Sequence, residues 1–187
     1  MPHADHNSAD TTNTLRRVGI DALLAHTCPD DAYRLAEQGM AACGHAALAA
    51  ALQCHVRDIM HAFPEPGLWV NDARMKQALA TLEVEHYEIG SKALDQWSVR
   101  WLQGLGSWMR PGVPMGARNQ RTHWVASHEG LIYDINADSW LPAEVWRTQI
   151  LPDLLEVWKT DTYEVRKTFV VWANVSAELR QGRDGQG

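Results

Sequence analysis

Residues 121–136 constrain the fold more than any other part of the chain, because they predict a hairpin whose register can be counted. Two predicted strands, 121–127 and 131–136, lie on either side of Glu129-Gly130. A two-residue turn there places His128 opposite Leu131, and counting back along both strands places His123 opposite Asn136. Asp134 then lies on the same face as a diagonal neighbour. The other face is apolar and predicts packing on a core, through Trp124, Ala126, Leu131, Tyr133 and Ile135.

A cysteine opens the next informative segment. Cys43 precedes a run rich in Ala and Leu, without proline, that favours a helix from the cysteine onward to about Phe63. A thiol at a helix N-terminus, beside an imidazolium, has a lowered pKa and can act as a nucleophile. Gln38 lies five residues upstream, where its side-chain amide and the Cys43 N–H could stabilise an oxyanion.

Together these residues predict a catalytic triad. Cys43 is the nucleophile, His123 the base, and Asn136 the residue that orients the imidazole, with Asp134 as the alternative third member. Taken singly, each has a structural explanation, because a cysteine in an apolar helix is usually a small buried side chain. We assign that role to Cys28 and Cys54. The order and spacing of the four residues favour catalysis for Cys43.

The block Gln-x4-Cys, followed by His123-Trp124, a short hairpin ending at Asp134-Ile135-Asn136, a proline-containing helix and an apolar strand, resembles a Josephin domain from about Glu37 to Trp172. That family belongs to the papain-like cysteine proteases and is known for deubiquitinase activity. The resemblance implies an α+β papain-like fold, with a helical subdomain carrying the cysteine packed on an antiparallel sheet. It also implies a protein or peptide substrate, with ubiquitin or a ubiquitin-like conjugate as the family's example. The hairpin is shorter than usual for that family, and Gly44-His45 departs from its more common residues.

Two other functions remain as alternatives. The same triad could serve a peptidase, deamidase or acyltransferase acting on a substrate other than ubiquitin. The chain could also be an inactive binding module. Trp97, Trp101 and Trp108 fall near helical spacing and predict a helix with one tryptophan-rich face. Trp101 on that face is a candidate substrate-binding residue, and so is Trp124, which follows the base and would shield the site.

Composition narrows the remaining possibilities. The net charge is −6, and no basic run exceeds Arg16-Arg17, so a nucleic-acid partner is not expected. No apolar stretch of membrane-spanning length and no signal pattern occurs, so we expect no membrane partner and a cytoplasmic location, with secretion as an effector left open. Cys43, His45, Cys54 and His55 lack a recognised zinc spacing, and we expect neither a metal nor another cofactor.

One domain is expected over residues 15–176, between a disordered tail at 1–14 and a frayed end at 177–187. Within it, Pro64 to Gly67 should end the cysteine helix. A helix capped by Asn71 or Asp72 should run to about Leu82 and precede a strand from Val84 to Ile89. A strand at 113–117, helices opened by Pro142 and Pro152, and a closing strand at 169–172 complete the expectation.

Overall fold

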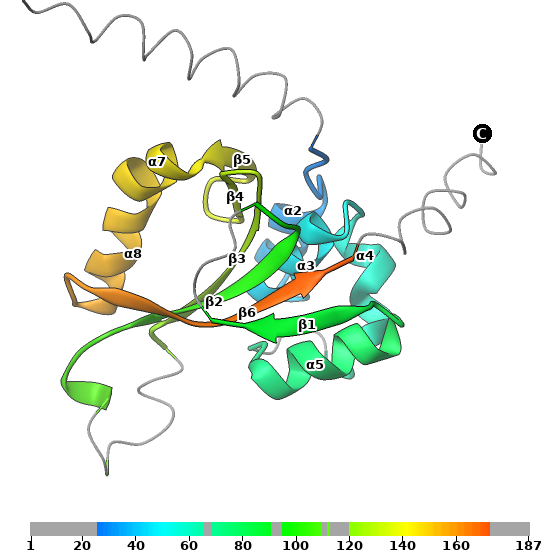
Figure 1. The fold of residues 1–187 in the computed structure, drawn as a ribbon, viewed down its shortest axis with the longest axis horizontal. Coiled ribbons are helices and arrows are strands. Elements are labelled where there is room, and N and C mark those ends of the chain that lie inside the picture. The colour runs from blue at the N-terminus through cyan, green and yellow to red at the C-terminus, as the bar shows by residue number, and fades with distance from the viewer. Residues whose placement is uncertain (1–25, 66–68, 91–94, 110–111, 113–119, 173–187) are drawn as a thin grey trace, which may run out of the picture.

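The computed structural model describes residues 26–65, 69–90, 95–109, 112 and 120–172. These form an α+β structure with an antiparallel sheet (Figure 1). The expected tails at 1–14 and 177–187 and the expected strand at 113–117 lie outside the described residues. The α-helices are α2 (Ala32–Glu37), α3 (Cys43–Ala51), α4 (Val56–Ile59), α5 (Asp72–Thr81), α7 (Ala143–Val145) and α8 (Leu151–Trp158). Short 3-10 segments are η1 (Met60–Ala62) and η2 (Ser107–Met109), and η3 (Trp146–Ile150) is a π-helical segment.

Six strands form one sheet in the order β1-β6-β2-β3-β4-β5. They are β1 (His86–Ile89), β2 (Ser98–Gly104), β3 (Thr122–His128), β4 (Leu131–Asp134), β5 (Ser139–Pro142) and β6 (Tyr163–Val171). All neighbouring pairs are antiparallel. The β3–β4 hairpin has the predicted register, with His128 opposite Leu131 and Ala126 opposite Tyr133. Glu129 and Gly130 both have positive φ, as a tight two-residue hairpin turn requires.

The sheet separates two apolar clusters, because successive side chains along β3 point to opposite faces. Trp124 and Ala126 pack with α3, whereas Val125 packs with α7, η3 and α8. Figure 1 shows α7 and α8 along one side of the sheet and α3 beyond the central strands on the other. The sheet is therefore covered on both faces, and α3 is held directly against the strand that carries His123.

The cysteine helix is shorter than the sequence predicts. α3 ends at Ala51, and Gln53 takes a left-handed conformation with φ 57°. The Gln53 side chain stabilises this turn, since its amide donates to Ala50 O at 2.7 Å and its carbonyl accepts from Thr27 N at 2.7 Å. The chain then restarts as α4. Helix propensity alone could not reveal this break, because it depends on a contact with residue 27.

The prediction of a helix across Trp97 to Trp108 is wrong, because residues 98–104 form the central strand β2. β2 pairs with β3 on one side and β6 on the other. Trp97, Val99 and Trp101 share one face with the α3 cluster, at a spacing of two residues rather than four. The spacing from 97 to 101 fits both periods, and the pairing partners decide between them.

Other expectations agree with the structure. Asn71 caps α5, where its side chain accepts from Arg74 N at 3.0 Å, and β1 and the closing strand β6 form at the edge and within the sheet. The strand β5, which ends at Pro142, was not expected. A helical region follows directly from Ala143, and Pro152 lies in the first turn of α8, where a missing N–H costs least.

Candidate thiol site

Cys43 is the first residue of α3 and is half-buried. The preceding Ala42 is extended, with φ −140° and ψ 175°, so the chain turns sharply into the helix at the cysteine. The first N–H groups of a helix lack partners within it, and the helix dipole places partial positive charge there. The thiol of Cys43 therefore lies where a negative charge is stabilised.

Gly44 permits a close approach between this helix end and a distant segment. A Cβ at position 44 would lie 2.4 Å from Cβ of Val70, so any larger residue would displace that side chain. The Val70 carbonyl in turn accepts a hydrogen bond of 2.6 Å from Nε1 of Trp124, the residue after His123. Val70 thus links the start of the cysteine helix to the strand that carries the histidine.

His123 and Asp134 form a buried pair. Nε2 of His123 donates to Oδ1 of Asp134 at 2.9 Å, and their side chains are 7% and 0% exposed. Asp134 is held from two further sides: Nε1 of Trp146 donates to Oδ2 at 2.8 Å, and the Asn136 N–H donates to Oδ1 at 2.9 Å. Because Nε2 faces Asp134, Nδ1 is the ring nitrogen that remains for the hydrogen bond between His123 and Cys43.

The charges of this group stabilise one another. Burial alone would lower the pKa of His123, but the charges of Asp134 and Cys43 and the hydrogen bonds to both outweigh it and raise the pKa to about 10. Burial opposes the charge of Asp134 as well, yet His123, Trp146 and the Asn136 amide together hold its pKa below the ordinary value. The arrangement therefore favours a protonated imidazole beside an ionised Asp134 carboxylate at neutral pH.

Asn136 does not take the place opposite His123 that the register predicts. β4 ends at Asp134, and residues 135–138 turn away before the pairing can reach position 136. The Asn136 side chain is exposed. The backbone N–H of Asn136 donates to the carboxylate of Asp134, two residues earlier, as in an Asx-turn. Asp134, the alternative third member, is the residue that contacts His123.

The other candidate residues lie around this pair. Gln38 is exposed at the C-terminal cap of α2. Trp124 is buried beneath the site, stacked on half-buried Trp101 with ring centroids 5.7 Å apart and an interplanar angle of 7°. A tryptophan this deeply packed supports the strand rather than offering a surface to a substrate. The side chain of Trp108 lies outside the described residues.

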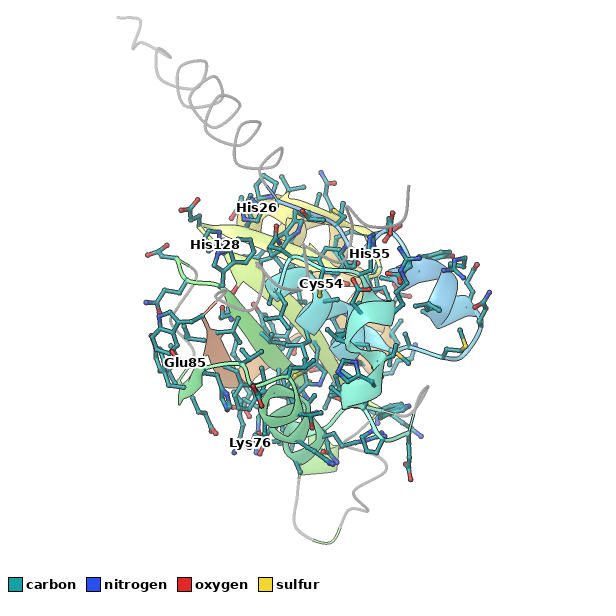
Figure 2. The ribbon with its side chains drawn as sticks, turned by 90° about the vertical axis from the view of Figure 1, so that its right-hand side faces the viewer. His26, Cys54, His55, Lys76, Glu85 and His128 are labelled. Carbon is teal, nitrogen blue, oxygen red and sulfur yellow. The ribbon has the colours of Figure 1, made fainter. Side chains whose placement is uncertain are left out.

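Three features of the structure carry no clear sequence signal. Trp146 completes the environment of Asp134 from a helical segment on the opposite side of the sheet from α3. His45 is fully buried two residues after the cysteine. At the far end of β3, His128 bonds to His26 at 2.9 Å and stacks on Trp97, and Figure 2 shows the two histidines together at one edge of the molecule. Trp146 and His128 depend on partners remote in the sequence, and the burial of His45 depends on Phe63.

Within the described ranges, one group of side chains has metal-ligand chemistry: Asp30, Asp31 and His55. The carboxylate of Asp31 already accepts hydrogen bonds from Val56 N at 2.8 Å and Arg57 N at 3.0 Å. His55 bonds to Asp30 at 2.6 Å. This cluster is explained as the cap of α4, which needs such acceptors at its first turn.

Comparisons with protein-family models, with curated proteins and with solved structures gave no match to this chain. Among the helices of the described residues, none combines the length and the apolar character needed to cross a bilayer.

Proposed function

We propose that the protein is a papain-like cysteine hydrolase whose triad is Cys43, His123 and Asp134. The observation that carries this proposal is the buried imidazole of His123, which bonds through Nε2 to Asp134 and also bonds to Cys43. A cysteine at the start of a helix, a histidine on a strand and an orienting carboxylate meet the requirements of nucleophilic catalysis by a thiolate. The sequence resemblance to the Josephin domain supports the same fold and chemistry.

The proposed reaction begins from a thiolate–imidazolium pair, since the raised pKa of His123 keeps its ring protonated at neutral pH. The Cys43 thiolate attacks an amide or isopeptide carbonyl, and the Cys43 N–H, with Gln38 as a further donor, stabilises the oxyanion. His123 gives its proton to the departing amine as the C–N bond breaks. Water then gives a proton to His123 as its oxygen attacks the thioester carbonyl. The C–S bond breaks, the acid is released, and the thiolate–imidazolium pair is restored.

Asp134 has two roles in this proposal. Its bond to Nε2 fixes the orientation of the ring, so that Nδ1 is directed to the thiol. Its charge stabilises the imidazolium, while Trp146 and the Asn136 amide prevent the carboxylate from rotating away. The amide of Asn136 thus contributes to the site through its backbone rather than its side chain.

Alkylation of the three cysteines by iodoacetamide, read by peptide mass spectrometry from pH 5 to 9, tests the thiol chemistry. Cys54 is buried with its thiol donating to Ala49 O at 3.7 Å, and burial raises the pKa of Cys28, so both serve as internal controls. We expect Cys43 alone to react rapidly below pH 7, where an unpaired thiol is almost wholly protonated. Equal rates at all three cysteines would exclude the proposed function.

The substrate class is proposed from the resemblance and needs a separate test. A ubiquitin derivative with a C-terminal electrophile should label Cys43 in the intact protein if the substrate is a ubiquitin conjugate, and the Cys43→Ser variant should remain unlabelled. Rapid alkylation without labelling by this derivative would retain the hydrolase and exclude ubiquitin. A peptidase, deamidase or acyltransferase with the same triad would then be the better description.

A further inference from the structure

A second histidine, His45, lies beside the nucleophile, and the triad does not include it. His45 is the third residue of α3, two after Cys43, and is fully buried against Phe63 with ring centroids 4.2 Å apart. Its Nδ1 accepts a hydrogen bond of 3.0 Å from the N–H of Ala42. The ring therefore reaches back over the first turn to the residue that immediately precedes the cysteine.

This contact fixes both the tautomer and the charge of His45. An Nδ1 that accepts from an amide carries no proton, so the single ring proton lies on Nε2. Burial lowers the pKa of His45 to about 4, because it outweighs the opposing effect of a backbone hydrogen bond at Ala42, and the charge of Arg74 adds the smallest reduction. The ring is accordingly neutral wherever the proposed thiol chemistry operates.

The bond replaces a cap that the sequence does not otherwise provide. A helix usually begins with a Ser, Thr, Asp or Asn whose side chain satisfies an early N–H, whereas Ala42 has no polar side chain. His45 instead acts from the third position, as Glu or Gln does in a capping box. Within the described part of the chain, Nε2 of His45 has no hydrogen-bond partner. The bond from the Ala42 N–H to Nδ1 is therefore the hydrogen bond that orients the ring.

The held amide is directly relevant to Cys43. The held N–H belongs to the Ala41–Ala42 peptide, and the Ala42 carbonyl, in the peptide that leads to Cys43, accepts from the His45 backbone N–H at 3.0 Å. Together the two bonds fix the backbone conformation of Ala42, which sets the direction of the Cys43 side chain and of its N–H. Gly44, the residue after the cysteine, lets the same turn lie close to Val70, where a Cβ would clash. A shift of this turn would move the thiol relative to His123, which is anchored independently by Asp134.

From this geometry we propose that His45 is a positioning residue of the thiol site, whose ring holds the Ala41–Ala42 peptide, and with it the turn at Ala42, so that the thiol meets His123 and the Cys43 N–H faces the substrate carbonyl. The inference rests on the proposed function. It predicts that a hydrogen-bond acceptor at position 45, and not a histidine as such, is needed for a reactive Cys43.

Two substitutions at position 45 separate these requirements. His45→Gln retains an acceptor that can reach the Ala42 N–H, whereas His45→Leu fills a similar volume without one. A matched control is available in α4. There the third helical residue, Asp58, accepts through its carboxylate from the backbone N–H of the N-cap residue His55 at 3.1 Å, as His45 does from Ala42 in α3. Since α4 follows the C-terminal end of α3, Asp58→Leu removes an equivalent cap away from the thiol.

The measurement is the rate of iodoacetamide alkylation at Cys43 from pH 5 to 9, with the urea midpoint of each variant as a record of folding. We expect His45→Leu to lower the rate at pH 7 at least tenfold and to move the pH profile toward that of Cys28. His45→Gln should stay within threefold of the wild type. Asp58→Leu should lower the urea midpoint but leave the rate unchanged. If His45→Leu does not fold, His45→Met takes its place.

The outcomes distinguish this inference from the function on which it rests. A wild-type Cys43 no faster than Cys28 would overturn the proposed function. A fast wild-type Cys43 whose rate and pH profile are unchanged in folded His45→Leu would overturn the positioning role alone. A loss in Asp58→Leu as large as in His45→Leu would also overturn it, because reactivity would then follow general stability.

Discussion

The two histidines at the ends of β3 have opposite surroundings, although they lie on one strand five positions apart. His123 bonds to a carboxylate, and the pKa of its ring is raised to about 10 after burial is outweighed. His128 bonds to another imidazole, and burial together with the charge of His26 lowers its pKa in spite of Glu129. Burial disfavours the charged form of both rings, and only His123 has a carboxylate partner that reverses this effect.

The difference also separates chemistry from packing. The ring of His128 stacks on Trp97 at 3.8 Å and 8°, and His26 packs its edge against Trp140. A neutral imidazole in such an aromatic cluster behaves as a flat side chain with one polar contact. At the other end of the strand, the charged ring of His123 is surrounded by groups that can exchange protons with it.

The largest expected effect sharpens this contrast directly. His123→Ala should lower the rate of Cys43 alkylation at pH 7 by about a hundredfold, because the thiolate loses its cationic partner. His128→Ala is the matched control, with the same change on the same strand, and should leave the rate within about twofold. Peptide mass spectrometry of both variants measures this, and comparable losses in the two would contradict the assignment of His123.

A second pair of substitutions compares Asp134 with Asn136. Asp134→Asn keeps the shape but removes the charge that balances His123, so we expect a loss of about 3 kcal/mol in unfolding free energy, as for other broken buried pairs. Asn136→Ala should cost less than about 0.5 kcal/mol, because the side chain is exposed and the bond to Asp134 is made by the backbone. Urea unfolding gives both values, and a larger loss in Asn136→Ala would restore the side chain of Asn136 as the third member.

The smallest expected effect is the dependence of folding stability on the protonation of His45 at acidic pH. Its folded pKa of about 4 lies below the ordinary 6.5, so protons bind the unfolded chain more tightly, and stability falls as the pH drops from about 6.5 toward 4. His45→Gln removes this titration and should lose about 2 kcal/mol less than the wild type between pH 7 and pH 5. Identical pH dependence in the two proteins would contradict a buried neutral His45.

The pKa of His123 is shifted in the opposite direction, so its effect on stability has the opposite pH dependence. The stabilisation by the charged pair of His123 and Asp134 is lost as the pH rises through about 10.

The hairpin and α5 could be predicted because their signals are local. The register of β3 and β4 follows from Glu129-Gly130, and the cap of α5 follows from Asn71. The end of β4 could not be predicted, since it depends on how the Asp134 carboxylate divides its hydrogen bonds between His123, Trp146 and the chain itself. The conformation of Trp97 to Gly104 could not be predicted either, because β3 and β6 impose it.

The same limit applies to the candidate site. Cys43 and His123 stand out by residue type and setting, and Asp134 was one of two choices. The position of His45 depends on an amide three residues back and on Phe63, and no pattern of residue types marks such a contact. Trp146 likewise reaches Asp134 from a segment that the sequence marks only as apolar.

The order of strands in the sheet has a consequence for folding of the nascent chain during synthesis. β6 lies between β1 and β2, although it is made after every other strand in the sheet. Synthesis therefore incorporates Cys43, His45, His123 and Asp134 before β6, the strand that joins β1 to β2 and the rest of the sheet. Translation that stops short of residue 163 would yield a chain with every reactive group of the proposed site, but with β1 separated from the other four strands of the sheet.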